Sequence, residues 1–289
     1  SLFLYTAIAL QLLWWLGSIL VFTKLVLSSK NHRNYIFIPL LIALMLTNIS
    51  LLVLDVNGYK ALSLHVARTA VLLFCLLMGV LGGRVIPFFT VSGAKTSAIQ
   101  QPTWLTPLIT TLSLLGILVF FSGYFIQLPF TPATLMISAG IAHLIRLCYW
   151  RTASTLQISL LWSLHLSYFS LGLGLILLGS SYLFVMASAF YISFSDAIHV
   201  ITIAAMGLMI FAMMSRVSLG HTGRALLPHK LVSWVFLLIF ISAVTRVLLP
   251  VFQHSLLGWN ISLSAWLVAA SLFLIIYFPI LTKPKRSRF

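Results

Sequence analysis

Four histidines lie inside long apolar segments of this 289-residue sequence: His65, His143, His165 and His199. An ionisable side chain in such a segment is costly to desolvate, so it usually faces a partner, a cofactor or water. Neutral imidazole is a common protein ligand for metals, including haem iron and copper. A hydrogen bond to a nearby carbonyl or hydroxyl would explain any one of them. Four together favour a functional role for the set.

The chain has very few carboxylate side chains. There are 17 Lys and Arg residues but two acids, Asp55 and Asp196. Reactions that need a pair of carboxylates inside a membrane, as in many pumps, are therefore disfavoured. The two cysteines, Cys75 and Cys148, lie in apolar runs, which argues against a disulfide or a cysteine-rich metal site. Histidine is the main ligating group that remains.

The composition places these groups in an integral membrane protein. Apolar residues make up 61% of the chain and charged residues 7%, against about 25% charged residues in a soluble domain. The apolar runs are about 20 residues long, which fits transmembrane helices rather than barrel strands. We predict an all-α, polytopic protein with a single transmembrane domain over residues 1–289. The nine predicted spans are 2–27, 36–54, 62–81, 104–122, 132–150, 157–178, 196–214, 231–249 and 260–281.

Loop charge predicts the orientation of these spans. Lys and Arg gather in alternate connections, while the others carry almost no net charge. The basic segments are 28–35, 82–103, 146–156, 215–230 and the tail from 283. Under the positive-inside rule the C-terminus is cytoplasmic and residue 1 lies outside, which suggests further spans upstream. Because the basic residues are spread over short loops, nucleic-acid binding does not explain the net charge of +15.

With this orientation, two histidines and three charged residues are expected at one depth near the outer face. They are His65 with Arg68 one turn further on, His199 with Asp196 three residues earlier, and Arg246 at the outer end of its span. A b-type haem needs axial imidazoles, and its propionates suit arginine. These residues form our candidate cofactor site, with the two histidines as the axial pair. Snorkelling to the interface is the alternative explanation for both arginines.

The other two intramembrane histidines are expected in the inner half or the middle of their spans. His143, which shares a helical face with Arg146, and His165 are alternative ligands for a second haem or a metal.

Two predicted inner connections combine glycines, which allow tight turns, with arginine and hydroxyls. The first is GGRVIPFFT at 82–90, with Arg84 and Pro87, and the second is SRVSLGHTGR at 215–224, with Arg216 and Arg224. Neither matches a P-loop, and each is also compatible with an ordinary basic loop. The connection 179–195 is apolar enough to lie in the interface or to re-enter the membrane.

Five stretches of the sequence resemble the NnrS family, haem- and copper-containing membrane proteins linked to the nitric-oxide response in bacteria. The 196–224 block is the most specific, and the stretches occur in the family's order over most of the chain. They are NHRNY at 31–35, His65, GGRVIPFFT at 82–90, LWSLHLSYFSLGLGLILLG within 160–179, and DAIHVITIAAMGLMIFAMMSRVSLGHTGR at 196–224.

The resemblance implies haem b and copper binding, a role in tolerating nitric oxide or a related small ligand, and a multi-pass location in the bacterial inner (cytoplasmic) membrane. His65, His165, His199 and His221 fall in family-like stretches, and His143 does so less clearly. The resemblance also implies a full protein of about twelve spans, whose first span carries His and Glu. We expect that segment to be missing here. Asp196 stands where the family usually has a neutral residue.

Two other functions stay open. Gly/Pro-interrupted loops are compatible with a transporter of a small solute or metal, although no internal repeat is visible. An accessory subunit of a respiratory complex would need a protein partner. Whether the protein is an enzyme is left open, because reduction of nitric oxide consumes protons and Asp196 is the only acid on a histidine face.

Overall fold

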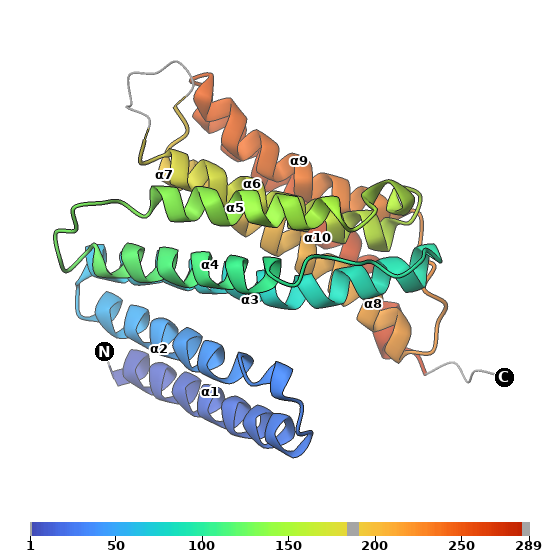
Figure 1. Cartoon of the computed structure of the whole chain (residues 1–289), viewed down its shortest axis with the longest axis horizontal. Helices are drawn as coiled ribbons and strands as arrows, with labels where there is room; N and C mark the ends of the chain where they lie inside the picture. The colour runs from blue at the N-terminus through green and yellow to red at the C-terminus, as the bar shows by residue number, and fades with distance from the viewer. Residues whose placement is uncertain (1, 184–190, 285–289) are drawn as a thin grey trace. The chain divides into compact units, whose positions relative to one another are not determined.

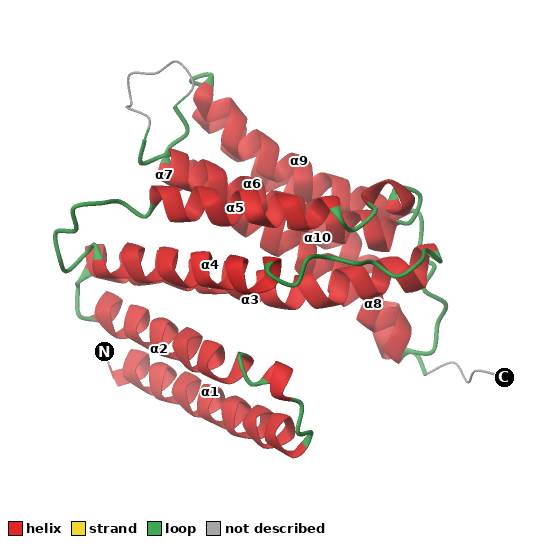
Figure 2. Ribbon diagram, in the orientation of Figure 1, coloured by secondary structure: helices red, strands yellow, loops and turns green. Residues whose placement is uncertain are grey.

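The computed structural model describes residues 2–183 and 191–284. All regular structure in these ranges is helical (Figure 2), which confirms the predicted all-α class. The middle of the 179–195 connection and the tail beyond 284 lie outside the described residues. The helices are α1 Leu2–Ser28, α2 Phe37–Val56, α3 Lys60–Ala94, α4 Leu105–Ser122, α5 Ala133–Cys148, α6 Ser159–Ser180, α7 Phe194–His199, a π-helical segment Val200–Gly207, α8 Leu208–His221, α9 Leu231–Val251 and α10 Ser255–Thr282.

Eight helices of the described chain are long and apolar enough to cross a membrane. Helix α7, the π-helical segment and α8 count as one of them, Phe194–His221. The chain is therefore a polytopic helical membrane protein, and its surroundings are a lipid bilayer. The predicted span 132–150 corresponds to α5, whose 16 residues rise about 24 Å, less than the ~30 Å hydrocarbon core. Helix α10 begins at Ser255 instead of 260. The orientation stays a prediction.

The predicted inner connection 82–103 is wrong over its first half. Helix α3 continues through the GGRVIPFFT motif to Ala94, with Pro87 inside the helix. Membrane helices tolerate glycine and proline because neighbouring helices fill the space and satisfy freed backbone groups. The second motif is corrected in the same way: α8 continues to His221, so most of that motif is also helical.

The chain forms two compact units, residues 1–77 with 114–131 and residues 78–113 with 132–289. Whether these form the single transmembrane domain that the sequence predicts stays open. In the first unit, α1 and α2 are an antiparallel pair (Figure 1). The Asn48 side-chain oxygen joins them: it accepts from Gln11 Nε2 at 2.9 Å and from Trp15 Nε1 at 3.1 Å.

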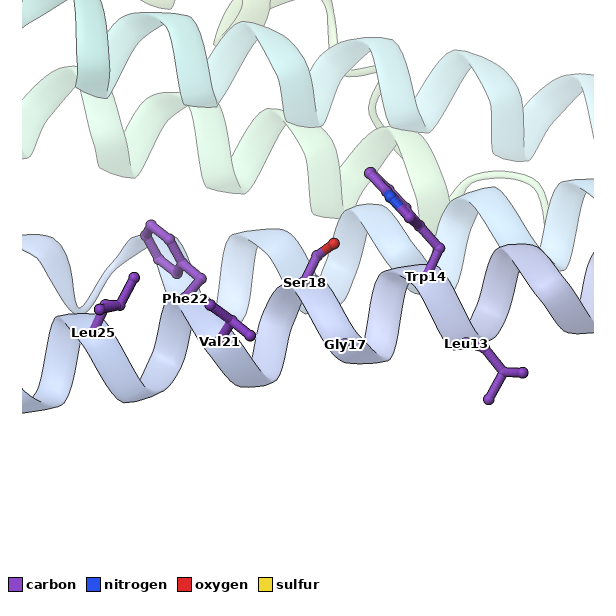
Figure 3. A pocket seen from close by; sticks show the side chains of 7 residues that line it. All are labelled: Leu13, Trp14, Gly17, Ser18, Val21, Phe22 and Leu25. Atoms are coloured by element: carbon purple, nitrogen blue, oxygen red, sulfur yellow. The ribbon is translucent and has the colours of Figure 1, made fainter.

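One face of α1 is apolar and open. Trp14 is 63% exposed there, and a Cβ added to Gly17 would meet nothing within 4 Å. Such a face suits contact with lipid chains or another apolar helix. Figure 3 shows the shallow groove on it, which is lined by Leu13, Trp14, Gly17, Ser18, Val21, Phe22 and Leu25.

In the second unit, α6 is the central helix and packs against α5, α8, α9 and the π-helical segment. Figure 1 shows α5 running along α6, and α9 packs closely on α10. The backbones of α5 and α6 nearly touch, because a Cβ on Gly140 would lie 2.5 Å from the Gly172 carbonyl oxygen. A Cβ on Gly179 would lie 2.7 Å from the Ala133 carbonyl oxygen. Small residues at the contact are what allow membrane helices to approach this closely.

Candidate functional site

A buried polar cluster lies where α3, α5 and α6 meet in the second unit. His143 and Arg146 of α5 are 0% and 1% exposed, and Tyr168 of α6 is 0% exposed. The Tyr168 hydroxyl lies 2.8 Å from His143 Nδ1 and accepts from Arg146 Nη1 at 3.2 Å. Arg146 also donates from Nη1 to the Gly79 carbonyl at 3.0 Å and from Nη2 to Thr106 Oγ1 at 2.9 Å.

Two glycines of α3 make room for this cluster. Gly79 and Gly83 are one turn apart and form a GxxxG pattern, a common device for close contact between membrane helices. A Cβ on Gly79 would lie 2.7 Å from His143 Cε1, and one on Gly83 would overlap Arg146 Nη1. Gly83, which belongs to the predicted loop motif at 82–90, therefore serves helix packing here instead of a turn.

Arg146 carries a buried charge that the chain leaves without a carboxylate. Asp55 pairs with Lys60 at 2.8 Å and Asp196 with Arg246 at 2.6 Å, and the sequence has no other acid. Arg146 lies in the last turn of α5, where the helix dipole favours a cation by at most about 2 kcal/mol. Burying an ion costs several kcal/mol after relaxation. The dipole and the three hydrogen bonds of the guanidinium, each worth about 1.5–3 kcal/mol when one group is charged, offset that cost.

His165 of α6 is held at both ring nitrogens. Its Nε2 lies 2.8 Å from Thr90 Oγ1 of α3, and its Nδ1 lies 3.0 Å from Thr152 Oγ1. The side chain is 1% exposed, and the Trp150 indole packs edge-on against its ring. A ring with both nitrogens hydrogen-bonded in an enclosed place is held for structure and has no free lone pair for a metal.

At the start of α7, Ser193 caps the helix and the Asp196 carboxylate forms an ion pair. Ser193 caps the helix by accepting from the Asp196 backbone N–H at 3.1 Å and donates to Asp196 Oδ2 at 2.7 Å. Oδ1 of the same carboxylate accepts from Arg246 Nη1 of α9, and these side chains are 17% and 15% exposed. The Arg246 guanidinium also lies 5.1 Å from the centre of the Trp259 ring. The arginine expected to meet haem propionates is thus already paired within the chain.

His199 ends α7 and immediately precedes the π-helical segment. Its Nδ1 donates to the Ser195 carbonyl, which leaves the Nε2 lone pair of the neutral ring available. Histidines that ligate metals are commonly oriented in this way, with one ring N–H donating to a backbone carbonyl. π-Helical turns often occur at functional sites, and here the Ser167 hydroxyl of α6 donates to the Ala205 carbonyl within the segment at 2.8 Å.

His65 belongs to the first unit. Its Nε2 donates to the Phe121 carbonyl at 3.2 Å, and its ring is stacked on Phe120 with centroids 4.6 Å apart. Arg68 lies one turn further along α3 and is half-buried. Because His199 lies in the second unit, the expected pairing of His65 with His199 stays a prediction.

Both arginines of the 215–224 motif join helices of the second unit. Arg216 of α8 lies over the Phe89 ring of α3, with its Cζ 3.8 Å from the ring centre. Arg224 Nη1 donates to the Ile280 carbonyl of α10 at 3.1 Å. Arg84 and His221 are exposed, and Pro87 is half-buried within α3. The motifs therefore contribute helix contacts, and a ligand role for their residues stays a prediction.

The four intramembrane histidines differ in how well they suit a haem iron. His199 fits best. His165 has no free nitrogen, and His143 Nε2, which has no hydrogen-bond partner, faces the tight α3 contact at Gly79. For copper, the described ranges contain no group of three or more His, Cys, Asp or Glu side chains placed to hold a metal ion. The described residues therefore do not fit a copper site made of these side chains.

Comparison with known families decides the membership of the chain. A family model described as NnrS protein matches residues 1–285. The chain belongs to the NnrS family. This confirms the resemblance carried by the five sequence stretches and relates this NnrS-family membrane protein to the nitric-oxide response. Comparisons with curated protein sequences and with solved structures give no match.

Several residues of this site were not singled out from the sequence. Tyr168, Thr90 and Thr152 hold the buried histidines, and ordinary polar residues in apolar helices give no signal of such partners. Two patterns in the sequence could have indicated these contacts. One is the GxxxG spacing of Gly79 and Gly83, and the other is the capping pattern of Ser193 and Asp196 at the start of α7.

Proposed function

We propose that this NnrS-family protein binds haem in the membrane, with His199 as an axial ligand, and acts in the response to nitric oxide. The observation that carries the ligand assignment is the state of the His199 ring. Its Nδ1–H is fixed by the Ser195 carbonyl, so its Nε2 is free to face a metal. The family membership supports the nitric-oxide role.

The surroundings of His199 support a role in holding a planar, anionic group. Asp196 holds the Arg246 guanidinium near the start of α7, and Trp259 supplies an aromatic face beside that cation. Bound haem would supply an iron that can bind nitric oxide, while His199 would orient it. Arg246 would have to share its guanidinium between Asp196 and a propionate.

Optical spectroscopy of the purified protein tests this proposal. The wild-type chain, isolated from haem-replete cells in detergent, should show a Soret band that shifts when nitric oxide is added. Replacing His199 by Ala should remove or shift that band. His254→Ala is the matched control, because His254 is exposed and its side chain makes no capping hydrogen bond at the start of α10; the variant should keep the wild-type spectrum.

Each part of the proposal can fail separately. A wild-type protein without a Soret band would overturn haem binding. A wild-type spectrum in the His199→Ala variant would overturn the ligand assignment alone. A Soret band that does not shift when nitric oxide is added would overturn the binding of nitric oxide to the haem. Copper analysis of the same sample tests the remaining cofactor expectation, for which the described residues offer no three-donor group.

The transporter alternative loses the feature that suggested it. The expectation rested on Gly/Pro-interrupted loops, but both motifs lie largely in continuous helices, α3 and α8. Discontinuous helices are what transporter sites are usually built from. No observation favours the respiratory-subunit alternative.

A further inference from the structure

Arg216 is a half-buried cation near the end of α8, and the contact that the structure gives its guanidinium is with an aromatic ring. Its Cζ lies 3.8 Å from the centre of the Phe89 ring of α3. An aromatic face attracts a cation, but it offers no oxygen to the five N–H groups of a guanidinium. Because the side chain is only half-buried, a ligand from outside the chain can reach these donors.

The position of Arg216 along its span places it at the level of the lipid headgroups. The 19 residues from 197 to 215 contain no Asp, Glu, Lys or Arg, and Arg216 is the first charged residue after them. A helix of this length rises about 28 Å, close to the ~30 Å thickness of the hydrocarbon core. Phe89 lies at the same depth, because the Arg216 guanidinium rests on its ring.

The end of the second unit that carries Arg216 is basic. Arg151 donates to Ser97, just beyond the end of α3. Arg224 donates to the Ile280 carbonyl in the last turn of α10. The two acidic side chains of the sequence lie elsewhere: Asp55 belongs to the first unit, and Asp196 lies at the other end of the span that carries Arg216. The basic residues beside the ends of these helices, apart from Arg216, are Arg84, Lys95, Arg151, Arg224, Lys230 and Lys283.

Orientation of the chain by its loops explains much of this charge. It does not explain why one arginine is drawn into the contact between two helices and held on an aromatic ring. A guanidinium fixed in this way presents its fork of donors in one orientation, which suits two oxygens of one phosphate. Basic positions between membrane helices at the cytoplasmic surface commonly bind anionic headgroups.

We propose that Arg216, held on Phe89, binds the phosphate of an anionic phospholipid. Exposed apolar side chains border this corner: Phe88, next to Phe89, is 67% exposed, and Met214, two residues before Arg216, is 47% exposed. These side chains suit the acyl chains of a lipid and not a free phosphate ion. The corner and His199 lie toward opposite ends of the span Phe194–His221, so lipid binding and haem binding can fail independently.

The test uses the purified full chain in a nonionic detergent. Phosphatidylglycerol, which is anionic, or phosphatidylcholine, which is zwitterionic, is added stepwise with the same acyl chains. Native mass spectrometry counts the lipids that each chain retains, and one phosphatidylglycerol should be retained in preference to phosphatidylcholine. The thermal unfolding midpoint should rise in a saturable way with phosphatidylglycerol, because a ligand that binds only the folded state stabilises it.

The variants assign the effect to the corner. Arg216→Gln should weaken the affinity for phosphatidylglycerol by about tenfold or more, because it removes charge-assisted hydrogen bonds to the phosphate. Arg216→Lys should restore only part of the affinity, since an ammonium lacks the planar fork. Arg151→Gln is the matched control. Arg151 is exposed and carries the same charge at the same end of the unit, and screening at physiological salt should keep its loss nearly without effect.

Three results would contradict the proposal. The first is equal retention of the two lipids by the wild-type protein. The second is an equal loss of affinity in Arg151→Gln and Arg216→Gln, which would indicate diffuse surface charge instead of a site. The third is an equal rise of the midpoint with inorganic phosphate, which would mean that the corner takes the free ion. If Arg216→Gln does not fold, the first and third comparisons still decide, since both use the wild-type chain.

Discussion

Two regions of the second unit hold an intramembrane histidine in different ways. In the α3–α5–α6 contact, His165 has both nitrogens held by threonine hydroxyls and is 1% exposed. At the end of α7, His199 is half-buried and has one nitrogen held by a backbone carbonyl. In the first arrangement both ring nitrogens are used in hydrogen bonds that hold helices together. The second fixes the orientation of the ring and leaves a lone pair, which is what a ligand needs.

The packing of the two regions differs in the same sense. A Cβ on Gly140, in the α5–α6 contact, would lie 2.5 Å from a backbone oxygen, whereas one on Gly207, at the end of the π-helical segment, would meet its nearest atom at 3.5 Å. Close contact and saturated hydrogen bonds go together in the first region. In the second region, looser packing goes together with a histidine nitrogen that keeps its lone pair.

The largest effects are expected from replacing each histidine by alanine, because one variant should lose stability and the other should lose the cofactor spectrum. His165→Ala should lower the free energy of unfolding by about 2–4 kcal/mol, because it opens a cavity and leaves Thr90 and Thr152 short of partners. It should not change the cofactor spectrum. His199→Ala should change the spectrum and, measured in cofactor-free protein, cost about 1 kcal/mol or less, since the ring is half-buried and makes one hydrogen bond. Equal destabilisation by the two variants would contradict the distinction.

A smaller effect is expected from adding one methyl group in each region. Gly140→Ala should destabilise the protein by about 1–3 kcal/mol, because the Gly172 carbonyl is backbone and cannot move aside without shifting α6. Gly207→Ala should be neutral or stabilise by up to about 1 kcal/mol, as alanine is the better helix former. Unfolding midpoints measured in one detergent compare the two. Tolerance of Gly140→Ala would show that the helix contact can relax.

The helical architecture was predictable because a bilayer imposes it. Apolar runs of about 20 residues have few other options in a membrane, so most predicted spans match helices within a few residues. The motif at 82–90 failed because glycine and proline end helices in water, where nothing fills the space that they leave. Within a bundle, Gly79 and Gly83 instead admit His143 and Arg146. Glycine and proline thus indicate a turn in a protein that folds in water and a close helix contact in a membrane helix bundle.

The sequence predicts only which ionisable residues of the candidate site lie in apolar segments, where burial is costly, and not which partners they meet. His143 and Arg146 are three residues apart on one helix, so their shared face follows from sequence. Their partner Tyr168 comes from another helix, and nothing marks it among other tyrosines. In the π-helical segment the Ala205 carbonyl accepts from the Ser167 hydroxyl of α6, a contact between residues 38 apart in sequence. Hydrophobic periodicity carries no information on such contacts.

The Asp196–Arg246 ion pair should give a moderate effect in the open region. A double-mutant cycle with Asp196→Asn and Arg246→Met should show a coupling of about 1–2 kcal/mol, because both side chains are mostly shielded from solvent. The coupling should fall only slightly in high salt. Asp196→Asn alone should cost more than the coupling, since the Asp196 carboxylate also accepts from Ser193. A coupling near zero would mean that the pair is solvated.

The smallest effect is expected at the second ion pair of the chain, Lys60 with Asp55. Their N···O distance of 2.8 Å is close to that of the Arg246 pair, but the side chains are 73% and 53% exposed. Solvent screens such pairs, so Lys60→Ala should change the free energy of unfolding by about 0.5 kcal/mol or less. Lys60 also opens α3, where the helix dipole disfavours a cation, which offsets part of any loss. A loss as large as that of Arg246→Met would show that distance, and not burial, sets the strength of ion pairs in this protein.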